Sequence, residues 1–125
     1  MPPSNERRTS SDFLKEDGDW TDYRQRFGLR KGDEIDLHFG KRDPAMSYYE
    51  AMSQIPTIVR DALKQAQAAG RPYIMFVHGS STSGPGKTTA RSQVRQFMRS
   101  KFATPFIVRR LCIEHETVFI ARIRL

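Results

Sequence analysis

A continuous apolar run at residues 73–77, preceded by a helical pattern, limits the folds that this chain of 125 residues can adopt. The run Tyr-Ile-Met-Phe-Val contains no charged residue, as expected for a strand that is buried on both faces. Before it, the apolar residues of segment 55–66 recur at the spacing of an amphipathic helix. Residues 34–38 alternate between polar and apolar and predict another strand. Strand, helix and strand in this order predict two parallel neighbours joined by a right-handed crossover.

The second half of the chain adds a helix and two strands to this pattern. Residues 88–102 predict a helix with one apolar face. Residues 106–113 and 117–125 predict two strands, and the short connection at 114–116 predicts an antiparallel hairpin with His115 at the surface. We therefore expect an α/β fold: a two-layer sandwich with a mixed four-stranded sheet, in the order strand-helix-strand-helix-strand-strand, and with its helices on one face.

The chain divides into a short N-terminal extension and one domain. Residues 1–32 are expected to be disordered or partly helical, because they begin with a polar stretch that cannot bury enough surface to order itself. Residues 33–125 hold the predicted strands and helices and are long enough to form a core. Within the extension, residues 13–29 predict a short helix that docks on the domain or on a protein partner. The aromatic residues that recur there at helical spacing are Trp20, Tyr23 and Phe27.

Composition narrows the class of protein. The single cysteine, Cys112, excludes a disulfide framework and a cysteine-based zinc cluster. The longest apolar run is about five residues, against the ~20 that a membrane-spanning helix needs, and the N-terminus lacks the apolar stretch of a secretory signal. We therefore expect a cytoplasmic protein without a membrane partner.

Positive charge is concentrated in the second half of the chain. Residues 71–125 carry ten Lys or Arg and two Asp or Glu, a net charge of +8 in a chain whose total is +7. Such a concentration raises the local density of polyanions and speeds their encounter, which favours nucleic acid, DNA or RNA, as a partner. The alternative is a basic surface that serves only solubility.

A glycine-rich loop follows the central apolar strand and precedes the second helix. The segment from Gly79 to Lys87 has the context of a Walker A loop, but Ser81 stands where that motif requires a glycine, five residues before Gly86. An NTPase is therefore not expected. The backbone N–H groups of such a turn and of a helix N-terminus still favour an anion, and Lys87 would add a mobile ammonium group. A solvated loop without a ligand is the alternative.

Three arginines follow the loop at positions i, i+4 and i+8 of the second helix, namely Arg91, Arg95 and Arg99. Like charges at this spacing destabilise a helix by a few tenths of a kcal/mol per pair. A helix that carries this cost is expected to use the stripe to contact phosphates. The alternative is a solvated face that tolerates its neighbours.

Candidate acid–base residues lie at the ends of the first two strands. Asp36 and His38 share one face of the first strand because side chains alternate along it, and His78 follows the second strand. The C-terminal ends of parallel neighbours share one edge of a sheet, so we expect these side chains to converge on the glycine-rich loop. A carboxylate beside an imidazole supports acid–base chemistry or orients a water or a metal ion. Structural histidines are the alternative.

Together these segments resemble the small MutS-related (Smr) domain over about residues 33–125. That family has a Leu-Asp-Leu-His-Gly motif, a His/Thr-Gly-x-Gly motif and a fold similar to the C-terminal domain of a bacterial translation initiation factor. This chain departs from the pattern at Phe39, where the family has glycine, and at Ser81, which replaces the last glycine of the second motif. The segments that carry the resemblance are Ile35-Asp36-Leu37-His38, Ala69-Gly70, residues 74–79, residues 83–86 and the Arg-rich helix.

The resemblance implies a function. The family includes nicking endonucleases that act on DNA or RNA, and other members that only bind. By position, Asp36 and His38 would be the hydrolytic pair. The resemblance further implies that the binding loop is formed by His78, Gly79, Gly84, Gly86 and Lys87.

We therefore expect a nucleic-acid-binding Smr-like domain, with endonuclease activity as the implied reaction. No cofactor is required. A divalent metal, Mg²⁺ or Mn²⁺, is the ion that hydrolysis would use, but its ligands stay open because one Asp and neutral histidines make a poor dedicated Mg²⁺ site. The alternative function is a non-catalytic adaptor that binds a protein partner through residues 13–29.

Overall fold

The computed structural model describes residues 13–37, 48–80 and 89–125, which form one mixed sheet and the helices that cover it. The sheet has five strands in the order β1-β4-β5-β3-β2. The strands are β1 (Leu14–Lys15), β2 (Glu34–Asp36), β3 (Tyr73–Val77), β4 (Ile113–Glu114) and β5 (Val118–Arg122). The α/β class is confirmed.

The expected parallel pair lies at one side of this sheet. β2 runs parallel to β3, with Glu34 opposite Met75 and Asp36 opposite Val77. The helix α3 (Tyr48–Ala68) lies between them in the sequence and packs on the sheet. β5 pairs antiparallel with both β3 and β4, so the predicted hairpin is present.

The prediction of four strands is wrong by one, because β1 adds a fifth. Leu14 lies opposite Ile113 in a parallel pairing, and the Leu14 N–H donates to the carbonyl of Cys112 at 2.9 Å. A strand of two residues carries no alternating pattern, so its sequence gave no signal. The segment expected to be an extension therefore contributes an edge strand.

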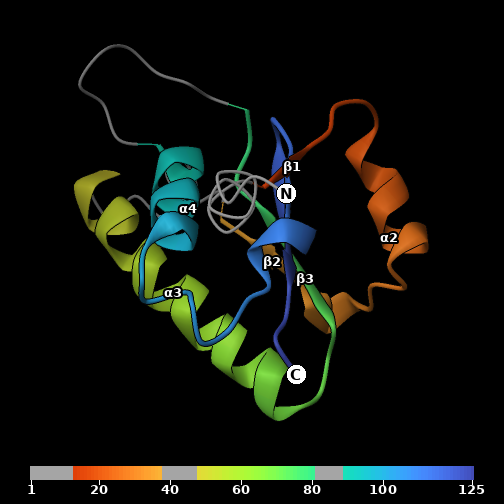
Figure 1. Ribbon diagram of the computed structural model, residues 1–125. Coiled ribbons are helices and arrows are strands. Elements are labelled where there is room, and N and C mark those ends of the chain that lie inside the picture. The colour runs from red at the N-terminus through yellow and green to blue at the C-terminus, as the bar shows by residue number, and fades with distance from the viewer. Residues whose placement is uncertain (1–12, 38–47, 81–88) are drawn as a thin grey trace, which may run out of the picture.

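The larger core lies on the face covered by α3 and α4 (Ala90–Arg99) (Figure 1). Side chains from both helices meet the sheet there, and the fully buried ones include Val59, Leu63, Phe76 and Phe119. Val59 and Leu63 lie four residues apart on α3 and belong to the continuous apolar side of that helix. None of the helices in the described ranges is long and apolar enough to cross a membrane.

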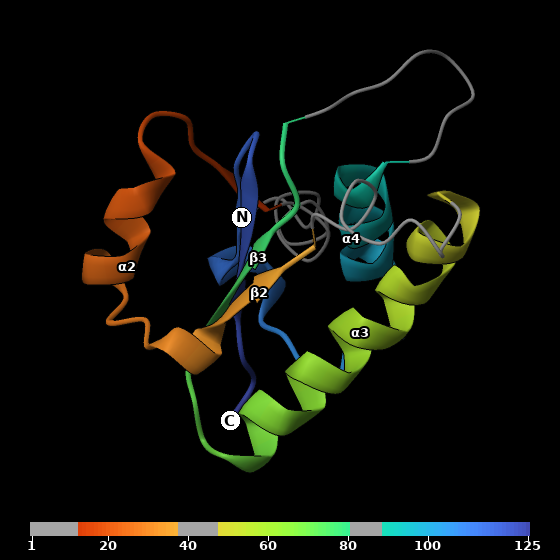
Figure 2. The same ribbon diagram turned by 180° about the vertical axis from the view of Figure 1, so that it is seen from behind.

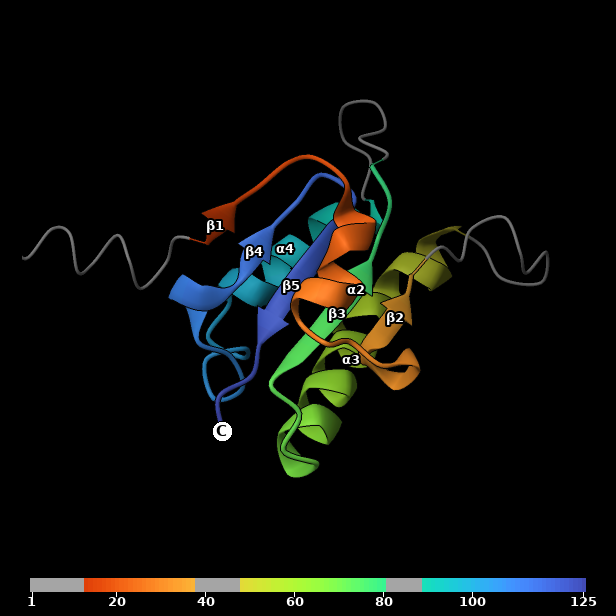
Figure 3. The same cartoon turned by 90° about the vertical axis from the view of Figure 1, so that its right-hand side faces the viewer.

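A second, smaller cluster lies on the opposite face, under the 3₁₀ turn η1 (Trp20–Asp22) and the short helix α2 (Tyr23–Arg26). Figure 3 shows α2 in front of the sheet and α3 and α4 behind it, and Figure 2 shows the sheet from its side, with α2 and the pair of α3 and α4 on opposite sides of it. The prediction of helices on one face alone is therefore corrected. β3 and β5 are apolar on both sides, so their second face also needs a cover.

The expected strand at 106–113 is mostly not a strand. Its residues form turns and the 3₁₀ helix η3 (Arg109–Leu111), and β4 begins only at Ile113. The side chain of Arg109 explains the difference, because it donates to the carbonyls of Met98 at 3.1 Å and Ser100 at 2.5 Å. These bonds hold Arg109 against the C-terminal end of α4, while residues 106–108 keep a single-residue bridge to the sheet, between Ile107 and Ile123.

Candidate functional site

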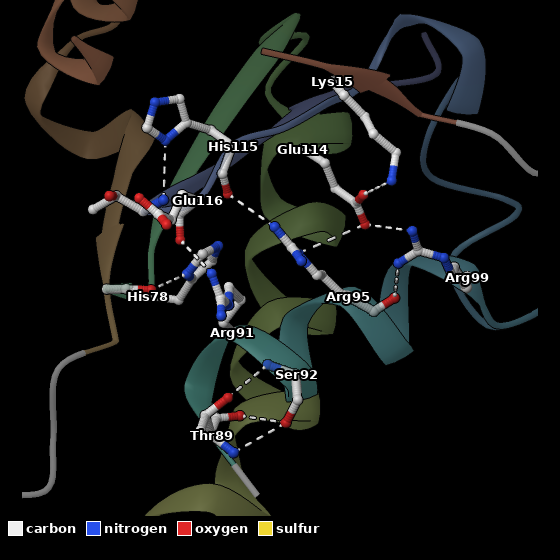
Figure 4. Close-up of polar contacts among 12 residues, drawn as sticks. Lys15, His78, Thr89, Arg91, Ser92, Arg95, Arg99, Glu114, His115 and Glu116 are labelled. Atoms are coloured by element: carbon white, nitrogen blue, oxygen red, sulfur yellow. Dashed lines mark hydrogen bonds and ion pairs between the residues drawn. The ribbon is translucent and has the colours of Figure 1, made fainter. Parts of the chain in front are cut away.

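The helix α4 begins at a capping box that sets the direction of its side chains. The Ser92 N–H donates to Thr89 Oγ1 at 3.1 Å, and the Thr89 N–H donates to Ser92 Oγ at 3.0 Å. Val94 and Met98 are fully buried against the sheet. The three arginines of the stripe therefore lie on the flank of α4 that faces the β4–β5 hairpin (Figure 4).

A buried carboxylate lies against this flank. Glu114 of β4 is 4% exposed, and its Oε2 lies 2.5 Å from Arg99 Nη2 and 3.7 Å from Arg95 Nε. On the other side, Lys15 Nζ of β1 lies 3.4 Å from Glu114 Oε1. A buried charge is stable only when it is paired, so these cations have a structural role. Glu114 was not among the predicted site residues, because a carboxylate beside a tight turn is typical of the surface.

The stripe also holds the hairpin turn through its backbone. Arg95 Nη2 donates to the carbonyl of His115 at 3.2 Å, and Arg91 Nη1 donates to the carbonyl of Glu116 at 3.3 Å (Figure 4). Burial lowers the pKa of Arg95, with the charge of Glu114 acting in the opposite direction. The guanidinium stays protonated, because arginine does not lose its proton in proteins.

His115 is another residue that sequence analysis placed wrongly. It was expected at the surface and is 4% exposed. Its Nδ1 accepts from the Thr117 N–H at 2.9 Å, and its Nε2 lies 2.9 Å from the carbonyl of Gly18. The ring therefore joins the hairpin to the segment before η1. No local signal reveals this contact, because its partners are 97 residues apart.

His78 lies at the end of β3, on the α4 side of the sheet. Its Nδ1 lies 2.7 Å from the carbonyl of Gly79 and donates to it, since a carbonyl only accepts. Burial, together with repulsion from Arg95 and Arg91, lowers the pKa of His78 to about 4, against the opposing hydrogen bond to Gly79. Within the described ranges no partner reaches its Nε2. At neutral pH, His78 thus offers a hydrogen-bond acceptor and no charge.

Gly79 follows with a positive φ of 84°, which a residue with a side chain rarely adopts. The N–H groups of His78 and Gly79 both donate to the carbonyl of Thr117, at 3.1 and 3.0 Å. The first two positions of the expected binding loop are therefore fixed to the hairpin. The remaining positions, Gly84, Gly86 and Lys87, lie outside the described residues.

The structure does not bring Asp36 to His78. Asp36 is exposed at the end of β2 opposite Val77, and both residues line a cavity on the α2 side of the sheet. His78 lies near Arg91 and Arg95 on the other side. Both residues lie at the same edge, as expected, but on opposite faces. His38, the proposed partner of Asp36, lies outside the described residues.

Neither the donor set nor the comparisons identify a catalytic centre. Among the residues that the structure describes, no three His, Cys, Asp or Glu side chains group so as to hold a metal ion. Cys112 is buried, and burial raises its thiol pKa to about 12, so it is a poor ligand and nucleophile. No family model, no curated protein and no solved structure matches this chain.

Proposed function

We propose that this protein binds nucleic acid through the α4–hairpin surface, defined as Lys15, Arg91, Arg95, Arg99 and the adjoining turn at 114–117. The observation that carries the proposal is the excess of cations there. Three of the four cationic side chains surround the carboxylate of Glu114, and Arg91 binds the backbone carbonyl of Glu116. The formal charge of these six residues is 4 − 2 = +2. Phosphates are the anions that such a surface recognises most readily.

The arginines of this surface are held in place and still reach solvent. The side chains of Arg95 and Arg99 are 32% and 45% exposed. A guanidinium has five N–H donors, and the contacts described above use only part of them. Arginines fixed by other bonds lose little entropy when a phosphate binds, so the buried Glu114 serves to orient them.

Two further features support the proposal. The glycine-rich loop with Gly84, Gly86 and Lys87 connects β3 to α4, so in the sequence it joins the two elements that flank this surface. The resemblance to Smr domains, which bind nucleic acid, points the same way. The proposal covers binding and not hydrolysis, because Asp36 lies on the other face of the sheet from the arginines.

Salt-dependent binding tests the proposal. Arg91→Gln is the variant of choice, because Glu114 keeps its contacts to Arg95 and Arg99 when Arg91 is removed. We expect weaker binding to DNA or RNA oligonucleotides, and a slope of log K against log salt that is smaller by about one. The measurement is fluorescence anisotropy over a series of salt concentrations.

Arg60→Gln is the matched control. It removes the same charge from α3, where the Arg60 side chain is 51% exposed, and we expect it to leave the salt slope unchanged. If the Arg91→Gln protein has the wild-type salt slope, α4 does not contact the nucleic acid. A wild-type protein that binds no strand at low salt would overturn the proposed function itself.

A further inference from the structure

A cavity of about 530 Å³ lies on the α2 side of the sheet, along β2, and reaches the C-terminal ends of β2 and β3 at Asp36 and Val77. Its volume falls in the range of small-ligand sites, and the ends of parallel strands are where open α/β sheets bind ligands. The residues that line it are Trp20, Arg24, Lys31, Glu34, Asp36 and Val77.

The wall formed by Trp20 is an oriented aromatic surface. The guanidinium of Arg24 lies over one face of the Trp20 ring, 5.1 Å from its centre, so a stacked base would use the other face of the indole. Arg24 is itself fixed by two bonds to Glu34, at 2.6 and 3.0 Å. The indole is half-buried, so it reaches the cavity without being free to turn away. A fixed indole with charged hydrogen-bonding groups at the rim suits a flat, polar-edged ring such as a nucleobase.

The cavity and the α4–hairpin surface meet at the end of β3. Val77 lines the cavity, and the next residue, His78, lies near Arg91 on the other face. Figure 3 shows this end of β3 between the start of the α2 segment and α4. A strand that passes over this edge can therefore contact α4 with its phosphates and Trp20 with a base.

We propose that the cavity holds an unpaired nucleobase stacked on Trp20, which makes single-stranded DNA or RNA the ligand. This inference rests on the proposed function, because the base belongs to the strand whose phosphates contact the α4–hairpin surface. Bases within a duplex are stacked on one another and have no free face. Stacking on an aromatic residue tolerates every base, so no sequence preference is required.

Trp20 is the one tryptophan of the chain, so tryptophan emission, excited selectively over that of the four tyrosines, reports on this cavity alone. The experiment titrates the full-length protein with oligothymidylate, with oligouridylate and with an abasic strand of equal length, and records both Trp20 fluorescence and strand anisotropy. We expect both base-containing strands to bind and to quench Trp20. The abasic strand keeps the phosphates and should bind about tenfold more weakly without quenching.

Two variants separate stacking from folding. Trp20→Leu should weaken binding to the base-containing strands about tenfold and leave the abasic strand unaffected, whereas Trp20→Phe keeps a ring and most of the affinity. Thermal melts establish that both variants fold. Binding without quenching, or a Trp20→Leu protein of wild-type affinity, would overturn the cavity proposal and leave the proposed function standing. If no strand binds at all, the proposed function fails and this inference with it.

Discussion

The two faces of the sheet are covered by different means. On the face under α3 and α4, the contacts are apolar, and residues such as Val59, Leu63, Phe76 and Phe119 are fully excluded from water. On the face under η1 and α2, a smaller cluster around Tyr23 and Met75 is bordered by ion pairs. The first cover depends on the hydrophobic effect, and the second also depends on charge.

The ion pairs on the second face each hold a carboxylate that is at least half-buried. Asp33 is 4% exposed and accepts both from Arg71 and from the Arg30 N–H. Burial opposes its ionisation, but these hydrogen bonds outweigh burial and lower the pKa of Asp33. Glu16 binds Arg26 at 2.8 and 3.1 Å. The stability of segments that depend on such contacts responds to salt and pH. The cavity lined by Trp20 lies on this face of the sheet.

The largest expected effect falls on the apolar face. Phe76→Ala removes a ring that is 0% exposed, and we expect it to lower the free energy of unfolding by about 4 kcal/mol. That loss is comparable to much of the total stability of a domain of this size. Because no charge is involved, the loss should be the same at low and high salt. Urea unfolding at two salt concentrations measures it.

Phe102→Ala is the control for this substitution. Phe102 is 63% exposed, so the same chemical change should alter stability by less than about 0.5 kcal/mol. A Phe76→Ala protein that loses no more than Phe102→Ala would show that α3 and α4 do not form the main core.

The next largest effect is a pH dependence of stability caused by His78, at the edge of the face under α3 and α4. The pKa of His78 is lowered from 6.5 to about 4 in the folded protein, so the unfolded chain takes up this proton first. The contribution of neutral His78 to stability is therefore fully present above pH 6.5. As the pH drops towards 4, the free energy of unfolding falls by about 3 kcal/mol. Urea unfolding at several pH values between 7 and 4 measures the decline.

The matched variant is His78→Asn. Asparagine keeps an N–H donor for the carbonyl of Gly79 but does not titrate, so the decline between pH 6.5 and 4 should shrink by most of that amount. Asp33 and Glu16 act in a different window. Their pKa values are lowered, so their stabilisation is present above pH 4.5 and is lost only as the pH falls further. Identical profiles for both proteins would contradict the assigned environment of His78.

The sequence predicted those parts of the fold that have a local signal. The apolar run at 73–77 and the helical spacing at 55–66 predicted the parallel pair and its crossover helix, and both are present. The spacing of Trp20, Tyr23 and Phe27 predicted helical structure but not where it packs. The packing of these residues on the sheet joins segments that are distant in the sequence, and the spacing of apolar residues does not predict such a contact.

The candidate site was predictable to the same extent. Periodicity placed the three arginines on one flank of α4, but burial of Glu114 depends on how α4 meets the hairpin. Likewise, Asp36 and His78 were expected together because both end parallel strands. Which face each occupies depends on register, and the observed pairing of Asp36 with Val77 places His78 on the other side. A shift of one residue reverses the faces, and sequence alone does not fix it.

The smallest expected effect tests the charged cover directly. The Tyr23 hydroxyl donates to Glu16 Oε1 at 2.9 Å, while Arg26 binds the same carboxylate. Tyr23→Phe leaves the buried ring in place, so only this hydrogen bond is lost, at a cost of about 1 kcal/mol. A double-mutant cycle with Glu16→Gln, followed by urea unfolding at pH 7 and pH 3, isolates the pair. The hydrogen bond from Arg26, supported by that from Tyr23, lowers the pKa of Glu16 against its partial burial, so the coupling should be full at pH 7 and decline as Glu16 is protonated. A coupling close to zero at pH 7 would mean that this cover is held by ring packing, as on the opposite face, and not by the carboxylate of Glu16.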